Sequence, residues 1–272
     1  MKNDHQALIS QKFNDLVLKE VEQTILKVTL NRPTFANAFN TNLAVELLTV
    51  FENLSLSKPT YRVVILSGAG QRAFCAGADL KERQGMSDDT WFQQHLIFER
   101  MLRAILHCPL PIIGAINGAA YGGGCELVAA LDFAYAVDSA KFAQTEVKLG
   151  IIPGLGGTQN LARAVGERRA KELILSGRSF GAQEAYEWGL INQVYPVGQL
   201  EDAVLVIAKE IAQNAPIAVQ QAKQAIQQGL QMSLSNGLAF EISAYHQTIS
   251  TKDRREGILA FNEKRVPNFV GK

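Results

Sequence analysis

The sequence has little of what builds disulfide or metal sites. It contains three cysteines (Cys75, Cys108 and Cys125) and no Cys-x-x-Cys pair. An odd count without such pairing argues against a disulfide framework and favours reduced thiols in a cytoplasmic protein. The four histidines are scattered and form no His-Glu-x-x-His motif, so we expect no structural or catalytic metal.

Charge of one sign and long apolar runs are also lacking. The chain has 27 basic and 26 acidic residues, a formal net charge of +1. Without an overall field, nucleic-acid or lipid binding would need a local basic patch. No apolar run approaches the ~20 residues of a membrane span, and the polar N-terminus does not resemble a secretory signal. We therefore expect neither a membrane protein nor a nucleic-acid-binding one.

The 272 residues, of which 47% are hydrophobic, are enough for one or two domains with a sizeable core. In the first half, β-branched apolar runs alternate with helical periodicity such as that of residues 42–54, which favours an α/β fold with parallel strands. The second half is alanine- and glutamine-rich with helical spacing. We predict a core over residues 1–198 and a helical region over 199–272. The expected strands are 23–30, 61–67, 111–117, 131–137 and 191–196, and the expected C-terminal helices are 199–213, 217–229, 234–250 and 253–264.

One glycine cluster resembles a dinucleotide fingerprint. Residues 68–73 read GAGQRA after a predicted strand, which fits G-x-G-x-x-A. The fingerprint requires a helix that opens at the glycines, but the residues that follow have little helical periodicity. The sequence therefore predicts a tight turn here and not a nicotinamide site.

A second cluster, Gly122–Gly124, follows a predicted strand and precedes an apolar helix over 125–131. Glycines at a helix start leave backbone N–H groups accessible, and the helix dipole adds positive potential, so this is a place to hold an anion or a developing oxyanion. Glu126 stands one turn into the helix. It is either an acid/base group whose pKa is raised by apolar surroundings or a residue that complements the dipole.

Glu146 lies twenty residues further on, before the glycine-rich turn that contains Gly154. Two carboxylates next to glycine turns would suit general acid/base work on one bound molecule. Two glutamates at this separation are a weak signal alone, and Lys148 could simply neutralise Glu146.

Together these segments are similar to the enoyl-CoA hydratase (crotonase) family, and closest to its methylglutaconyl-CoA hydratase-like branch. The motifs are FCAGADLK at 74–81, GGGCE at 122–126 and EVKLGIIPGLGGTQ at 146–159. The resemblance continues through LNRP at 30–33 and through DRREG and AFNEKR at 253–265, in the family's order over roughly residues 15–270.

The resemblance implies a spiral of ββα turns with a helical C-terminal trimerisation region, in trimers or dimers of trimers. It implies a coenzyme A thioester as the substrate and no separate cofactor. Residues matched to the family's site comprise the catalytic Glu126 and Glu146, the oxyanion-hole amides of Ala78 and Gly123, the water-positioning amide of Gly154, and the coenzyme A contacts Ala76, Lys81, Phe261 and Lys264, the last two from a neighbouring subunit.

Retention of both glutamates favours a hydratase over relatives that isomerise or hydrolyse acyl-CoA. On this reading Glu146 delivers a proton to C2 while Glu126 orients and helps deprotonate the water. Thr34 stands where the family commonly has a lysine that reaches the nucleotide, which puts one phosphate contact in doubt.

The acyl group is left open between a straight chain and a branched chain with a second carboxylate, as in methylglutaconyl-CoA. A second carboxylate calls for a nearby cation, and the helix over 95–106, with Arg100 and Arg103, is a candidate wall. RNA binding, associated in a homologue with a lysine-rich helix, is disfavoured because residues 40–56 contain no Lys or Arg.

Overall fold

The computed structural model describes residues 8–56 and 60–272. Within them, the larger sheet is mostly parallel, with only its first two strands antiparallel to each other. In spatial order its strands are β1 (Leu16–Val21), β2 (Ile25–Leu30), β3 (Val63–Gly68), β5 (Ile112–Ile116), β7 (Phe133–Val137) and β10 (Gln193–Tyr195). The strands β2, β5, β7 and β10 lie within predicted strands, β3 extends one residue past the predicted range 61–67, and β1 was not predicted.

A second, four-stranded sheet is built from very short strands. They are β4 (Ala73–Cys75), β6 (Ala119–Tyr121), β8 (Lys141–Ala143) and β9 (Phe180–Gly181), of which β9 is antiparallel to β8. The chain passes from the large sheet to the small one after each of β3, β5 and β7, which gives repeated turns of a spiral. The expected α/β spiral is confirmed. The turn predicted at residues 68–73 is also confirmed, because β3 leads through a bend into β4 and not into a helix.

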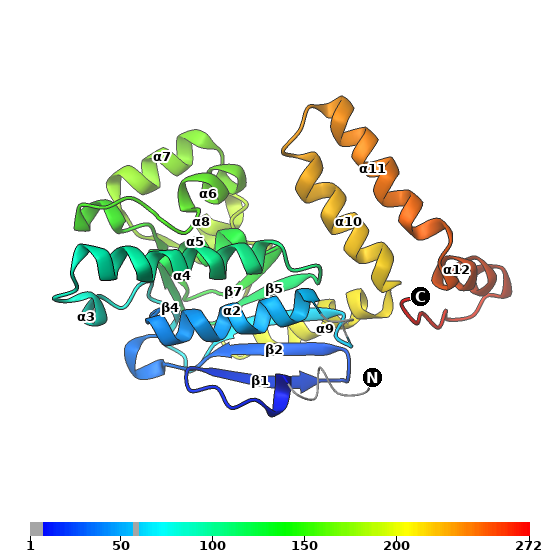
Figure 1. The fold of residues 1–272 in the computed structure, drawn as a ribbon, viewed down its shortest axis with the longest axis horizontal. Helices are drawn as coiled ribbons and strands as arrows, with labels where there is room; N and C mark the ends of the chain where they lie inside the picture. Colours follow the sequence, from blue (N-terminus) through cyan, green and yellow to red (C-terminus); the bar gives the residue numbers. More distant parts are fainter. Residues whose placement is uncertain (1–7, 57–59) are drawn as a thin grey trace.

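Helices cover both sheets and close each turn of the spiral. Helix α2 packs against α4, and α9 packs against β2, β3, β5 and β7 of the large sheet (Figure 1). The core helices are α2 (Thr41–Leu56), α3 (Leu80–Arg83), α4 (Asp88–Leu106), α5 (Gly123–Ala130), α6 (Gly157–Val165), α7 (Glu167–Ser176), α8 (Ala182–Glu187) and α9 (Leu200–Gln213), with short 3-10 turns η1 (Pro33–Phe35) and η2 (Glu146–Leu149).

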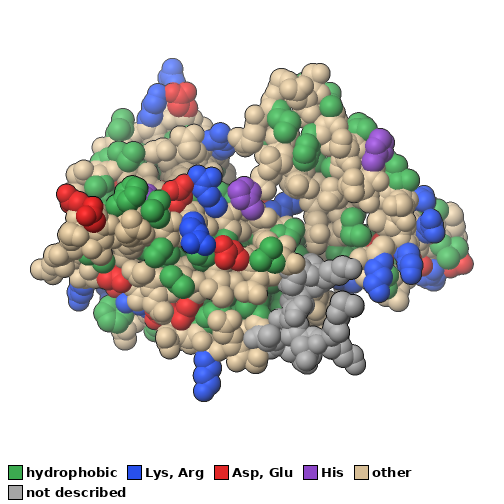
Figure 2. Space-filling model, in the orientation of Figure 1, with side chains coloured by type: hydrophobic (Ala, Val, Ile, Leu, Met, Phe, Trp, Pro, Cys, Tyr) green, Lys and Arg blue, Asp and Glu red, His purple; other side chains and the backbone are tan. Residues whose placement is uncertain are grey.

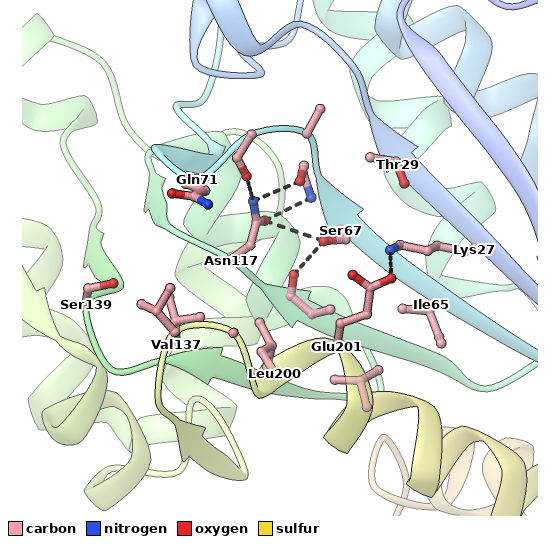
Figure 3. A pocket seen from close by; sticks show the side chains of 17 residues that line it. Lys27, Thr29, Ile65, Ser67, Gln71, Asn117, Val137, Ser139, Leu200 and Glu201 are labelled. Atoms are coloured by element: carbon pink, nitrogen blue, oxygen red, sulfur yellow. Dashed lines mark hydrogen bonds and ion pairs between the residues drawn. The ribbon is translucent and has the colours of Figure 1, made fainter.

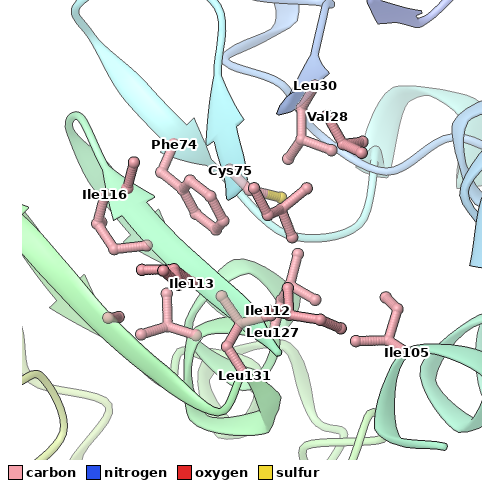
Figure 4. Close-up of a cluster of buried hydrophobic side chains, with 14 of the residues drawn as sticks. Val28, Leu30, Phe74, Cys75, Ile105, Ile112, Ile113, Ile116, Leu127 and Leu131 are labelled. Atoms are coloured by element: carbon pink, nitrogen blue, oxygen red, sulfur yellow. The ribbon is translucent and has the colours of Figure 1, made fainter. Parts of the chain in front are cut away.

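The core lies where strands buried on both faces meet the helices. Every residue of β3 and β5 is buried, as expected for parallel strands covered on both sides. Phe74 of β4 and Leu127 of α5 point into the same cluster as Ile113 of β5 (Figure 4). This packing fixes the starts of α3 and α5 relative to each other.

The last three helices extend away from the core (Figure 1). Helices α10 (Pro216–Gly229) and α11 (Leu234–Ile249) run side by side, and α12 (Lys252–Glu263) follows. No side chain of α10 is fully buried, and hydrophobic side chains show on the outer surface of this arm (Figure 2). The boundary at residue 198 stays a prediction, since α9 still lies against the large sheet. No helix in the described ranges has the length and apolar character needed to cross a membrane.

Candidate active site

The two glutamates twenty residues apart in sequence line one cavity of about 800 Å³. Glu126 stands in the first turn of α5 and is 2% exposed, and Glu146 begins η2 and is 7% exposed. The cavity is also lined by the loop after β4 and by the loop between η2 and α6. The spiral therefore brings both acids to the wall of a single chamber large enough for an acyl group.

Glu126 is held by backbone amides. Its Oε1 accepts hydrogen bonds from the N–H groups of Leu155 at 2.7 Å and Gly157 at 2.8 Å. Burial raises the pKa of Glu126 to about 7, with a smaller contribution from the nearby charge of Glu146. Together they outweigh the hydrogen bonds from these amides, which favour the charged form. A carboxyl group with this pKa can take up or release a proton close to neutral pH.

Glu146 faces the glycine turn that precedes α5. A side chain at Gly122, whose φ is +52°, would place its Cβ 3.1 Å from Glu146 Oε1, so the turn and the acid are in close contact. The fully buried Gln144, in the amide orientation that satisfies both groups, donates to Glu146 Oε2 at 3.0 Å. Burial raises the pKa of Glu146 as well, so the two acids compete for protons in one chamber.

Two backbone amides on the same wall are available as donors. Ala78 and Gly123 line the cavity, and neither N–H donates a hydrogen bond within the described part of the chain. The loops touch: a Cβ on Gly77, whose φ is +87°, would lie 3.0 Å from the Gly123 nitrogen. Adjacent backbone donors on one wall can stabilise an oxygen that gains negative charge.

The Ala78 loop is fixed by bonds on both sides. Phe39 N donates to Gly77 O, and Asp79 N donates to Phe39 O, each at 2.7 Å. The Asp79 carboxylate caps α3 by accepting from the amides of Lys81 and Glu82, and it accepts from Arg32 Nη2 at 3.0 Å. The amide of Ala78 is therefore placed by a rigid frame.

The other matched residues fall into two groups. Gly154 and Ala76 line the cavity, and Lys81 lies beside it on α3, exposed to solvent. Phe261 lies on α12 and Lys264 ends it, in the arm that extends away from the core, and Phe261 is 84% exposed. Neither lines the cavity of its own chain, so a coenzyme A contact from them requires a second copy.

The neighbouring thiol is not part of this chemistry. Cys125 is fully buried, and burial raises the pKa of its thiol, which keeps it protonated and unreactive. The three cysteines are all free and buried.

A wall of the cavity that sequence reasoning missed carries a cation. Arg83, at the end of α3, is only 8% exposed, and its Cζ lies 4.2 Å from the centroid of the Trp91 ring. Trp91, His95 and Phe98 line the same wall from α4. Their spacing of three and four residues is a helical signal, but Arg83 stands in a four-residue helix with no detectable period.

The arginines considered from the sequence do not line this cavity. Arg100 pairs with Glu52, and Arg103 pairs with Glu99. Both arginine side chains are 65% exposed. Of the predicted wall over 95–106, His95 and Phe98 line the cavity.

A second cavity, of about 580 Å³, lies between the large sheet and the start of α9 (Figure 3). In it Asn117 Nδ2 donates to the carbonyls of Gly68 and Gly70, and Lys27 pairs with Glu201. Glu201 is the one acidic residue in the described lining, so this cavity offers no comparable pair of carboxylates.

Residues 20–272 match the family model described as enoyl-CoA hydratase/isomerase. The mouse mitochondrial methylglutaconyl-CoA hydratase is 43% identical over 258 residues, covering 93% of this chain and 82% of that protein. The short-chain-enoyl-CoA hydratase of Clostridium acetobutylicum is 39% identical over 254 residues, covering 93% and 97%. The crystal structure of an enoyl-CoA hydratase from Bacillus anthracis superposes with a TM-score of 0.93 at 46% identity, covering 95% of this chain and all of that one.

Proposed function

The chain belongs to the enoyl-CoA hydratase/isomerase family, and we propose that it is a hydratase that adds water across the 2,3 double bond of a 2-enoyl-CoA thioester. The observation that carries the proposal is the convergence of Glu126, Glu146 and the amides of Ala78 and Gly123 on one cavity. These are the groups that hydration requires, and relatives named as hydratases support the assignment.

In the proposed reaction the thioester oxygen accepts hydrogen bonds from the amides of Ala78 and Gly123. A water held by Glu126 and Glu146 loses a proton to Glu126 as its oxygen bonds to C3. The π electrons move toward C2 and the thioester oxygen, which gains enolate character, and the two amides stabilise that charge. Losing one such donor typically costs about 3–4 kcal/mol of transition-state stabilisation.

The reaction is completed when Glu146 delivers its proton to C2. One acid is therefore protonated before the reaction and the other after it, and a proton transfer between them or through water resets the site. The raised pKa values of both acids suit this exchange, because a single proton shared by the pair avoids two adjacent buried charges.

Isomerisation of a 3-enoyl-CoA is a weaker candidate, because it moves a proton without using a positioned water.

RNA binding finds no support in α2, whose described residues carry Glu46 and Glu52 and no Lys or Arg.

A second candidate for the substrate is an enoyl-CoA whose acyl group carries another carboxylate, as methylglutaconyl-CoA does. The specific observation in its favour is the buried guanidinium of Arg83 in the cavity wall. A buried cation without an ion-pair partner is costly, and a carboxylate on the substrate would supply that partner.

We also propose that the protein works as a trimer or dimer of trimers, in which Phe261 and Lys264 of one subunit contact coenzyme A bound to the next. The exposed apolar side chains of the C-terminal arm support this, since unpartnered apolar surface of this extent marks an interface. They include Leu230, Leu234, Leu238, Ile242 and Tyr245. Ala76 and Lys81 would contact coenzyme A from the cavity side. Position 34, which is a threonine, would not supply a lysine contact.

The test is hydration of a panel of enoyl-CoA thioesters, followed by the loss of enoyl absorbance. We expect wild type to turn over, and Glu126→Gln and Glu146→Gln each to lower kcat by about 10²–10⁴ with an unchanged circular dichroism spectrum. Glu187→Gln, an exposed site on α8, is the matched control and should keep wild-type activity.

Unchanged turnover in both cavity variants would remove the proposed mechanism. Turnover of a 3-enoyl-CoA by wild type without hydration of any 2-enoyl-CoA would replace the hydratase by an isomerase.

A further inference from the structure

The Arg83 guanidinium is held on only one of its nitrogens. Nε donates to Gln94 Oε1 at 2.8 Å, while neither Nη1 nor Nη2 donates to any residue that the structure describes. The Trp91 ring lies 4.2 Å and the Phe98 ring 5.3 Å from Cζ, which fixes the plane of the group. No carboxylate among the described residues lies within ion-pair distance of it. Asp88, also in this wall, is exposed and forms no ion pair with Arg83.

Gln94 is 3% exposed, and its bonds determine its orientation. While Oε1 accepts from Arg83, Nε2 donates to Glu82 Oε2 at 2.8 Å and to Thr41 Oγ1 at 2.9 Å. A flipped amide would set NH₂ against the guanidinium and oxygen against the Glu82 carboxylate. The amide therefore stands between a buried cation and the carboxylate next to it in sequence.

Glu82 is the natural ion partner for Arg83, and it is engaged elsewhere. Its carboxylate accepts from the backbone N–H of Thr41 at 3.0 Å as well as from Gln94. Gln94 thus donates a hydrogen bond to the Glu82 carboxylate and accepts one from Arg83 through Nε alone. The two Nη groups are left for something else in the cavity, in the planar arrangement that binds a carboxylate through two parallel hydrogen bonds.

We propose that Gln94 is a positioning residue for substrate selection: it keeps Glu82 from neutralising Arg83 and presents the Nη groups to a carboxylate on the acyl group. The inference rests on the proposed function only in that the cavity takes acyl-CoA. It assigns the substrate class as enoyl-CoA thioesters with a carboxylate distal to the double bond.

The test measures binding and not turnover. Glutaryl-CoA and pentanoyl-CoA have equally long acyl chains, lack the double bond, and differ in the distal carboxylate. By titration calorimetry we expect wild type to bind glutaryl-CoA at least about tenfold more tightly. Gln94→Met keeps length and helix propensity and should abolish this preference, because Glu82 then pairs with Arg83. Gln93→Leu, on the exposed side of the same helix, is the control and should retain it.

A second variant separates positioning from a structural role. Gln94→Met combined with Glu82→Gln removes the competing carboxylate and leaves the Arg83 guanidinium free to pair with the acyl carboxylate, so the preference for glutaryl-CoA should return. A purely structural defect would not be rescued in this way. Retention of the preference in a folded Gln94→Met variant, or failure of the double variant to restore it, would overturn the inference.

The two proposals fail differently. If wild type hydrates enoyl-CoA but binds both analogues equally, the role of Gln94 is wrong and the hydratase proposal stands. If wild type prefers glutaryl-CoA but hydrates no enoyl-CoA, the hydratase proposal is wrong and the carboxylate subsite stands.

Discussion

Glu126 illustrates how its surroundings set the chemistry of a single residue. Three backbone amides, those of Gly154, Leu155 and Gly157, favour the charged carboxylate, yet its pKa rises to about 7 because the group is almost completely desolvated. The folded protein therefore holds a carboxyl group whose ionisation is unfavourable. Such a group suits proton transfer near neutral pH, but it lowers the stability of the fold.

This balance predicts how stability depends on pH. The pKa of Glu126 rises from 4.5 to about 7 on folding, so the folded state disfavours the charged form. Below pH 4.5 both states are protonated and nothing is lost. Between pH 4.5 and 7 the folded state loses up to about 3 kcal/mol relative to the unfolded one. Glu126→Gln cannot ionise and should become progressively more stable than wild type over this range.

Urea unfolding at pH 4.5 and pH 8, at one protein concentration, measures the effect. The stability difference between Glu126→Gln and wild type should grow with pH, whereas Glu187→Gln should show no such growth. A difference that is the same at both pH values would mean that Glu126 is not desolvated as described.

At the residue level, the sequence motifs predicted the two glutamates of the cavity, which composition alone could not. The motifs around Glu126 and Glu146 identified both acids, although their spacing in sequence carries no geometric information. Arg83 and Gln94 could not be predicted in the same way, because their roles come from packing between α3 and α4 and not from any local pattern. The expected cation was instead sought on the long helix, where Arg100 and Arg103 face solvent.

Among the elements, the contact between α5 and β4 decides where the proposed oxyanion donors lie. Gly124 sits in the first turn of α5, and a Cβ there would lie 2.0 Å from the carbonyl oxygen of Cys75. Only a glycine lets the helix start approach the strand this closely. The approach sets the distance between the Gly123 amide and the loop that carries Ala78.

Gly124→Ala should therefore damage both fold and activity. The methyl group meets backbone on the strand, so the helix must move, and we expect a loss of about 1–3 kcal/mol or more in unfolding free energy. We also expect kcat to fall in whatever folds, because the two amides separate. Gly229→Ala on α10, where a Cβ would have an ordinary 3.8 Å contact, is the control: it should leave kcat unchanged and should not lower the unfolding free energy, because alanine is the better helix former. Wild-type kcat in Gly124→Ala would contradict the assigned donors.

The long elements were predictable and the short ones were not. The strands β2, β3, β5 and β7 carry β-branched or apolar runs, and the helices α9 to α12 carry helical spacing; their observed bounds lie within a residue or two of those expected. Strands β4, β6 and β8 have three residues each, which is too few to show a period. The strand β1 was missed because its alternation includes Lys19 and Glu20 on an exposed edge.

Over the whole molecule, the exposed apolar side chains of the C-terminal arm and the position of Phe261 outside the cavity both support the proposed assembly. Phe261→Ala combined with Lys264→Ala should raise KM for the thioester and leave kcat near wild type, because in the proposed assembly those side chains contact coenzyme A and not the reacting carbons. Oligomers re-formed from this variant mixed with Glu126→Gln should regain sites with wild-type KM, since an intact cavity then meets an intact arm.

Light scattering on each sample is the check that the proposed oligomer persists. A KM in the mixture equal to that of the arm variant alone would show that each chain completes its own site.

In the proposed mechanism Glu126 and Glu146 act on one water as a unit, and a double-mutant cycle on hydration is the sharpest test of this coupling. Single-turnover rates are measured for wild type, Glu126→Gln, Glu146→Gln and the double variant with one enoyl-CoA. Residues that act together are not additive, so the double variant should be about as slow as the slower single variant. Losses that multiply in the double variant would show that the two acids work independently and would contradict the account.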